Sequence, residues 1–200
     1  MRESEPMSGE LPSLWLGSRL RWATWLVIAI VANGGVAMAD QNDSALDGLF
    51  ARLAAARDVA EAAVIEEEIW TRWLESGRDD VDEQMTRGMR AMERGDGATA
   101  LLAFDAVVEL APDFAEGWNK RATLHWLTGD WRSSVADIDR TLALEARHFG
   151  ALSGLALILE AEGKPFEALE ALEQVIAIHP RLPQLPQRIE KLTRQLGEAV

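Results

Sequence analysis

Three consecutive segments of 34 residues decide the fold of this 200-residue sequence. Residues 81–114 read VDEQMTRGMRAMERGDGATALLAFDAVVELAPDF, residues 115–148 read AEGWNKRATLHWLTGDWRSSVADIDRTLALEARH, and residues 149–182 read FGALSGLALILEAEGKPFEALEALEQVIAIHPRL. The same period separates the pairs Gly95-Asp96, Gly129-Asp130 and Gly163-Lys164. A fixed internal period of this length is typical of an array of supersecondary units, so the sequence predicts a repeat protein.

Each segment divides into two amphipathic runs on either side of its glycine-containing turn, which predicts a helical hairpin. Small residues allow the two helices to approach closely, larger residues fill the seam between them, and proline ends a helix. The small positions are Gly88, Ala122 and Ala156 in the first helices and Ala100, Ser134 and Ala168 in the second; the seam positions are Phe104, Ile138 and Leu172; the prolines are Pro112 and Pro180. Because one hairpin cannot bury its apolar face alone, we expect the hairpins to stack.

These positions resemble the tetratricopeptide repeat (TPR) family, whose period is also 34 residues. Trp118 matches the first large residue of the family pattern in the second unit. The resemblance covers residues 81–182 and implies an all-α fold, a right-handed α-solenoid of stacked helical hairpins.

Both ends of the stack have amphipathic sequence of their own. Residues 183–200 predict a helix that caps the last hairpin, with its basic side chains turned outward. Residues 40–80 predict another helical pair that lacks an in-phase Gly-Asp turn and a helix-ending proline. We interpret this pair as a degenerate repeat; the alternative is a distinct N-terminal hairpin.

Residues 1–39 are typical of a cleavable signal peptide. Arg19 and Arg21 precede an apolar segment of eleven residues, 22–32, and Ala37-Met38-Ala39 supplies the small residues of a cleavage site. At a rise of about 1.5 Å per residue this segment covers about half of a roughly 30 Å hydrocarbon core. We therefore expect a periplasmic protein of a bacterial cell envelope, and the alternative is an uncleaved signal anchor.

Charge and composition exclude several functions. The formal net charge of −13 argues against nucleic acid and against an anionic membrane surface as partners. The sequence has no cysteine, which excludes disulfides and thiolate chemistry, and no pair of histidines has the spacing of a zinc site. We predict no metal, no cofactor and no enzymatic activity.

The resemblance to TPR proteins implies a concave groove lined by the first helix of each unit. In this sequence the candidate peptide-binding residues are Met85, Met89, Asn119, Lys120, Thr123, Trp126, Ser153 and Leu157. Methionine and tryptophan suit an apolar anchor, and an asparagine amide suits an extended backbone. The alternatives are that the methionines pack against the N-terminal hairpin, that Trp126 packs against the next helix, and that Asn119 is simply solvated.

The family positions that grip acidic peptide tails depart from the pattern in this chain. Met85, Met89, Gly150 and Gly154 occupy four of those positions, and only Lys120 is retained. Arg87 and Arg121 stand where the family usually has a large apolar residue, and we expect Arg121 to pair with Asp137 or Asp139.

The prediction for function is therefore a non-catalytic scaffold that binds a peptide segment of another envelope protein. One alternative is a self-associating structural protein that uses the methionines and the Trp70/Trp73 hairpin. The other is an accessory subunit that the signal segment anchors in the membrane.

Overall fold

The computed structural model describes residues 44–198, which all belong to one compact unit. The predicted signal peptide, residues 1–39, lies outside the described residues. Every regular element between residues 44 and 198 is an α-helix. None of these helices combines the length and the apolar character needed to cross a membrane.

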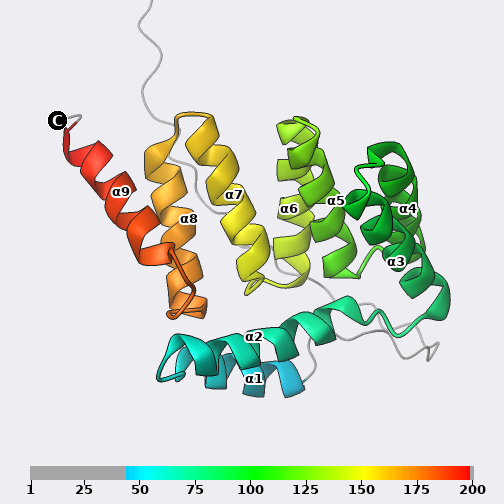
Figure 1. Cartoon of the computed structure of the whole chain (residues 1–200), viewed down its shortest axis with the longest axis horizontal. Coiled ribbons are helices and arrows are strands. Elements are labelled where there is room, and N and C mark those ends of the chain that lie inside the picture. Colours follow the sequence, from blue (N-terminus) through cyan, green and yellow to red (C-terminus); the bar gives the residue numbers. More distant parts are fainter. Residues whose placement is uncertain (1–43, 199–200) are drawn as a thin grey trace, which may run out of the picture. The chain divides into compact units, whose positions relative to one another are not determined.

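Three helical hairpins follow the predicted period. They are α3 (Asp79–Glu93) with α4 (Gly97–Leu110), α5 (Ala115–Leu127) with α6 (Trp131–Leu144), and α7 (Phe149–Ala161) with α8 (Pro165–Ile178). Each hairpin packs on the next through α4 against α5 and α6 against α7 (Figure 1). The all-α solenoid of stacked hairpins is therefore confirmed.

The three turns have one shared geometry. Gly95, Gly129 and Gly163 have φ angles of 72°, 83° and 70°, a left-handed conformation that glycine adopts without strain. Asp96 and Asp130 then cap α4 and α6 by accepting hydrogen bonds from the backbone N–H groups of Thr99 and Ser133. The turn and the cap together explain why Gly-Asp recurs in the sequence.

The small residues at the seam act as predicted. A methyl group on Gly88 would lie 2.4 Å from the ring of Phe104, so only glycine allows this approach of α3 to α4. In the second hairpin, the Ser134 hydroxyl donates to the backbone oxygen of Ala122 at 2.8 Å. Ala100, Phe104, Ala122, Ser134, Ile138, Ala156, Ala168 and Leu172 are all buried.

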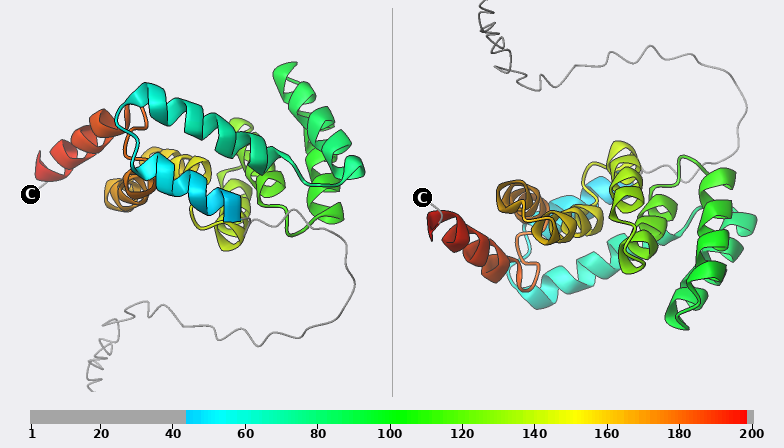
Figure 2. Two further views of the ribbon diagram at one scale, coloured as in Figure 1. Left: turned by 90° about the horizontal axis from the view of Figure 1, so that it is seen from below. Right: turned by 90° about the horizontal axis from the view of Figure 1, so that it is seen from above.

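The first two helices, α1 (Ser44–Ala54) and α2 (Val59–Leu74), do not add a further hairpin beside α3. They run across the ends of the repeat helices, where α1 packs against α8 and α2 against α5 (Figures 1 and 2). The interpretation of residues 40–80 as a degenerate repeat is therefore wrong, and the alternative of a distinct hairpin holds.

The core explains this position of α1 and α2. Leu53, Ile69 and Trp73 are fully buried in one cluster with Phe149, Leu172 and other residues of α7 and α8. The last helix, α9 (Leu185–Glu198), closes the same cluster with Leu185 and Leu192, and it packs on α8 as the predicted cap.

Candidate functional site

A pocket of about 230 Å³ opens between α5, α6 and α7. Its lining consists of Asn119, Ala122, Thr123, Trp126, Ser134, Ile138, Gly150, Ala151, Ser153, Gly154 and Leu157. At its rim, Trp126 and Leu157 are 36% and 40% exposed, which is high for side chains of this size and polarity. The side chains of Trp126 and Leu157 are therefore accessible to a ligand at the opening of the pocket.

Glycine keeps the pocket open. A methyl group on Gly154 would meet only the Cδ1 atom of Ile138, at 3.8 Å, which is ordinary van der Waals contact. A larger side chain at this position would extend into the space that the pocket occupies. The absence of a side chain on α7 thus creates the site, while Ile138 and Ala151 supply buried apolar surface.

The polar groups of the pocket are mostly engaged within the protein. The hydroxyls of Thr123 and Ser153 donate to the backbone oxygens of Asn119 and Phe149, at 2.9 Å and 2.7 Å. The Asn119 amide donates to Oε2 of Glu116 at 2.9 Å, which leaves its amide oxygen without a partner among the described residues. The pocket can therefore accept a few hydrogen bonds, but apolar contact dominates.

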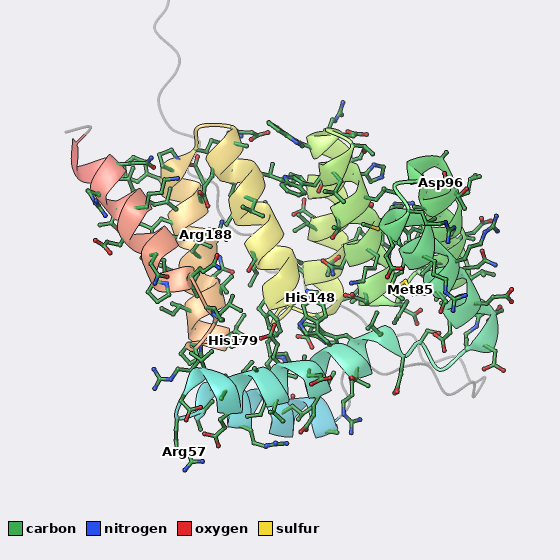
Figure 3. The ribbon with its side chains drawn as sticks, in the orientation of Figure 1. Arg57, Met85, Asp96, His148, His179 and Arg188 are labelled. Carbon is green, nitrogen blue, oxygen red and sulfur yellow. The ribbon has the colours of Figure 1, made fainter. Side chains whose placement is uncertain are left out.

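Five of the eight predicted groove residues meet around this pocket: Asn119, Thr123, Trp126, Ser153 and Leu157. Met85 is not accessible, and its inclusion in the groove was wrong. It is 1% exposed and belongs to the buried cluster of Phe104, against which partly buried Met89 and Leu74 pack. Figure 3 shows Met85 on α3, inside the first hairpin. Leu74 is the last residue of α2, so the alternative of packing against the N-terminal hairpin describes Met85 better.

Lys120 is also taken up by contacts within the chain. Its ammonium nitrogen lies 2.8 Å from Oε1 of Glu116 and 5.4 Å from the ring centroid of Trp70. A lysine held between a buried carboxylate and an aromatic face has little charge left to offer a peptide. Arg121 pairs with Asp137 as expected, through two hydrogen bonds of 2.8 Å and 2.7 Å.

Sequence reasoning missed a buried polar cluster next to the pocket. Glu116 and His148 are both fully buried, and Nε2 of His148 lies 2.9 Å from Oε2 of Glu116. Nδ1 of His148 accepts the backbone N–H of Ala151, so the ring proton on Nε2 is the one donated to the carboxylate. Trp73 of α2 stacks on the imidazole with ring centroids 4.0 Å apart. Figure 3 shows His148 where α7 begins, facing α2.

The cluster keeps Glu116 ionised. Burial alone favours the protonated carboxyl, but the hydrogen bond from His148 and the charge of Lys120 outweigh it, so the pKa of Glu116 lies below its ordinary value. A second pair repeats the pattern nearby. Nε2 of His179 lies 3.1 Å from Oε2 of Glu66, and this hydrogen bond holds the pKa of Glu66 below its ordinary value.

These clusters fasten α2 to the repeats. The ring of Trp70 lies against His148 and Phe149, and its Nε1 donates to Glu66 at 3.2 Å. No local pattern could reveal the pairs, because Glu66 and His179 stand 113 residues apart. Between residues 44 and 198 no group of three or more acidic or histidine side chains is arranged to hold a metal ion.

The comparisons with known proteins agree with this geometry. No protein-family model matches the chain. A TPR repeat-containing protein of Rhizobium etli is 38% identical over 152 residues, which cover 76% of this chain and 74% of that protein. The tetratricopeptide repeat protein 36 homolog of Nematostella vectensis is 33% identical over 109 residues, 53% of this chain and 59% of the relative.

The chain belongs to the TPR repeat-containing proteins. Solved structures share the fold at lower identity. The TPR2B domain of yeast Sti1, solved as a complex with an Hsp70 peptide, superposes with a TM-score of 0.55 at 18% identity, covering 59% of this chain and 99% of that chain. The crystal structure of MamA gives 0.55 at 22% identity, covering 58% and 68%.

Proposed function

We propose that the protein is an exported scaffold that binds a peptide segment of another cell-envelope protein in the pocket between α5 and α7. The observation that carries this proposal is the convergence of Trp126, Leu157 and Asn119 on one open, largely apolar pocket. Similar folds support binding of this kind: the Sti1 domain was solved with an Hsp70 peptide, and a TPR domain of Spaghetti (RPAP3) with an HSP90 peptide.

The peptide should be held by an apolar side chain. The volume of about 230 Å³ is below the roughly 300–1,000 Å³ of pockets that enclose drug-sized ligands, so it suits one or two anchoring side chains. An acidic tail is a poor fit, because Lys120 is already paired with Glu116 and glycines stand at positions 150 and 154. Trp126 would cover the anchor, and the free oxygen of Asn119 would accept a backbone N–H group.

The test uses peptides selected from a random display library on the mature chain, residues 40–200. Replacing Trp126 by alanine should weaken their binding at least tenfold, measured by fluorescence anisotropy, with an unchanged melting temperature. Trp131→Ala is the matched control, because Trp131 is similarly exposed, at 37%, but does not line the pocket.

A second variant fills the site instead of emptying it. Gly154→Leu should abolish binding by occupying the pocket with its own side chain. If Trp126→Ala unfolds the protein while Gly154→Leu binds peptides normally, Trp126 has a structural role and the pocket is not the binding site.

Export and membrane attachment have a separate test. Cell-envelope fractions should contain a chain whose N-terminal residue is Asp40, the first residue after the predicted cleavage site. A chain that retains residues 22–32 and sediments with membranes would favour the anchored accessory subunit.

Self-association remains the alternative, with a smaller surface than predicted. Trp73 and Met85 are 0% and 1% exposed, whereas Trp70, Met89 and Met92 are partly buried.

A further inference from the structure

The outer face of α3 is the end of the stack that no preceding hairpin covers, because α1 and α2 lie elsewhere (Figures 1 and 2). Arg87, Arg90 and Arg94 share this face, since residues spaced by three and four positions lie above one another on a helix. We call these three residues the arginine stripe. All three are exposed.

The arginine stripe is unusual because its side chains make no hydrogen bond or ion pair within the described residues. The chain has 33 acidic against 20 basic residues, so an arginine has many possible partners. Most arginines between residues 44 and 198 make a side-chain hydrogen bond, an ion pair or a ring contact. The exceptions within this range are Arg87, Arg90, Arg94 and Arg132. Three of these four arginines therefore stand together on one helix face.

The second hairpin indicates which kind of side chain would pair with Arg87. Arg121 is one repeat later and pairs with Asp137 of its own hairpin and with Asp105 of the preceding hairpin, at 2.7 Å in each case. The residues one repeat earlier than those acids are Ala103 and Thr71. Arg87 thus has neither of the two acidic partners that Arg121 has. A helix of another protein, placed where a preceding hairpin would stack, could supply the carboxylate.

A shallow groove of about 610 Å³ runs along this face, and its charges are divided along α3. Asp79, Asp82 and Glu83 line its first half and the arginine stripe its second. Asp82 accepts hydrogen bonds from Ser76, so Asp79 and Glu83 remain open to a partner. The acidic half would repel a polyphosphate chain laid along the groove, which argues against nucleic acid.

We propose that the arginine stripe docks a helix of another protein that is acidic in its first half and basic in its second, antiparallel to α3. An antiparallel helix with acidic residues in its first half sets carboxylates against the guanidinium groups, which bind them in a planar, two-pronged geometry. Basic residues in its second half then face Asp79 and Glu83. The two helix dipoles also oppose each other in this orientation, which is favourable. This surface is separate from the pocket at Trp126 and does not depend on the proposed function.

The test is a display library of helical peptides, roughly 18 residues long, selected on the full chain at low salt. The enriched peptides should be acidic in their first half and basic in their second. Their affinity should fall at least tenfold in the Arg87→Glu/Arg90→Glu/Arg94→Glu variant and fall steeply with added salt. Because these side chains make no hydrogen bond or ion pair, the variant should keep the helical circular dichroism spectrum of the original protein. Its melting temperature should fall only slightly, through the loss of positive charge near the C-terminal end of α3.

Arg132→Glu is the matched control, since Arg132 is equally unpaired but lies on α6, and it should leave the affinity unchanged. The proposal is overturned if the selection yields no acidic-first helices, if their affinity is the same for the triple variant, or if a short RNA binds as tightly as the peptides. Trp126→Ala should not affect these peptides, which distinguishes this surface from the pocket.

Discussion

Gly150 and Gly154 lie one helical turn apart in α7, and a methyl group would have opposite effects at the two positions. On Gly150 it would lie 2.6 Å from the ring of Trp70, whereas on Gly154 it meets only Ile138 at 3.8 Å. The ring of Trp70 cannot easily move, because it is hydrogen-bonded to Glu66 and packed against neighbouring rings. Gly150 therefore allows Trp70 of α2 to pack against α7, and Gly154 leaves the pocket open.

We expect Gly150→Ala to lower the free energy of unfolding by about 1–3 kcal/mol through overpacking. Gly154→Ala should raise it by up to about 1 kcal/mol, because alanine is the better helix former. Urea unfolding of both variants measures the difference. Equal stability of the Gly150→Ala and Gly154→Ala variants would mean that the ring of Trp70 does not pack closely against Gly150.

Glu116 makes stability depend on pH. Its pKa is lowered in the folded protein, so its contribution is complete above its ordinary value of about 4.5 and is lost as the pH falls through the lowered folded value. Glu116→Gln removes the negative charge beside Lys120 and weakens the buried hydrogen bond from His148, which should cost about 1–3 kcal/mol.

Urea unfolding between neutral pH and pH 3 measures this effect. The Glu116→Gln variant should be much less stable at neutral pH and should lose less of its stability on acidification than the original protein. Glu109→Gln is the control, because Glu109 is exposed on α4 and should change neither quantity. A parallel acid response in Glu116→Gln and the original protein would contradict the role of the buried pair.

At the level of whole helices, α3 to α8 could be predicted from sequence and the position of α1 and α2 could not. The repeat signal is local: Gly95, Gly129 and Gly163 adopt the same backbone conformation, and each turn is complete within a few residues. Trp126 could be assigned to an exposed groove position for the same reason, because the register of α5 follows from the period.

The position of the hairpin formed by α1 and α2 depends on contacts that sequence spacing does not reveal. Arg147 bonds to Asp47 across 100 residues at 2.7 Å, and its guanidinium lies over the ring of Phe50. The prediction that Met85 lines the groove is wrong for a related reason. A residue at an inward repeat position is exposed only if nothing else packs there, and the period carries no information about Leu74.

Removal of the N-terminal hairpin of α1 and α2 tests whether the repeats need it for stability. A chain that begins at Gly77 should be poorly soluble or lack a cooperative thermal transition, because Phe149, Leu172 and Val175 would lose their contacts with Leu53 and Trp73. Circular dichroism and a thermal scan would measure this. A stable, cooperative chain 77–200 would show that the three repeats with α9 are sufficient and that the hairpin is an accessory.

The complete stack has an uneven distribution of buried apolar contacts. One cluster joins α1 and α2 to α7, α8 and α9, and another joins α3, α4 and α5, with a small cluster of α5, α6 and α7 between them. In repeat proteins stability is approximately a sum of units and neighbouring interfaces. The hairpin adds a link between distant helices, so we expect the α7–α9 end to open together with α1 and α2.

Val107 and Val175 allow a matched test, because they occupy the same repeat position in the first and third hairpins and both are fully buried. Each substitution to alanine should cost about 2 kcal/mol. Val175→Ala should speed amide hydrogen exchange in α1, α2 and α9 more than in α3, and Val107→Ala should do the reverse. Equal acceleration in all helices by both variants would mean that the stack opens as one unit, because the hairpin would then couple α3 as firmly as it couples α9.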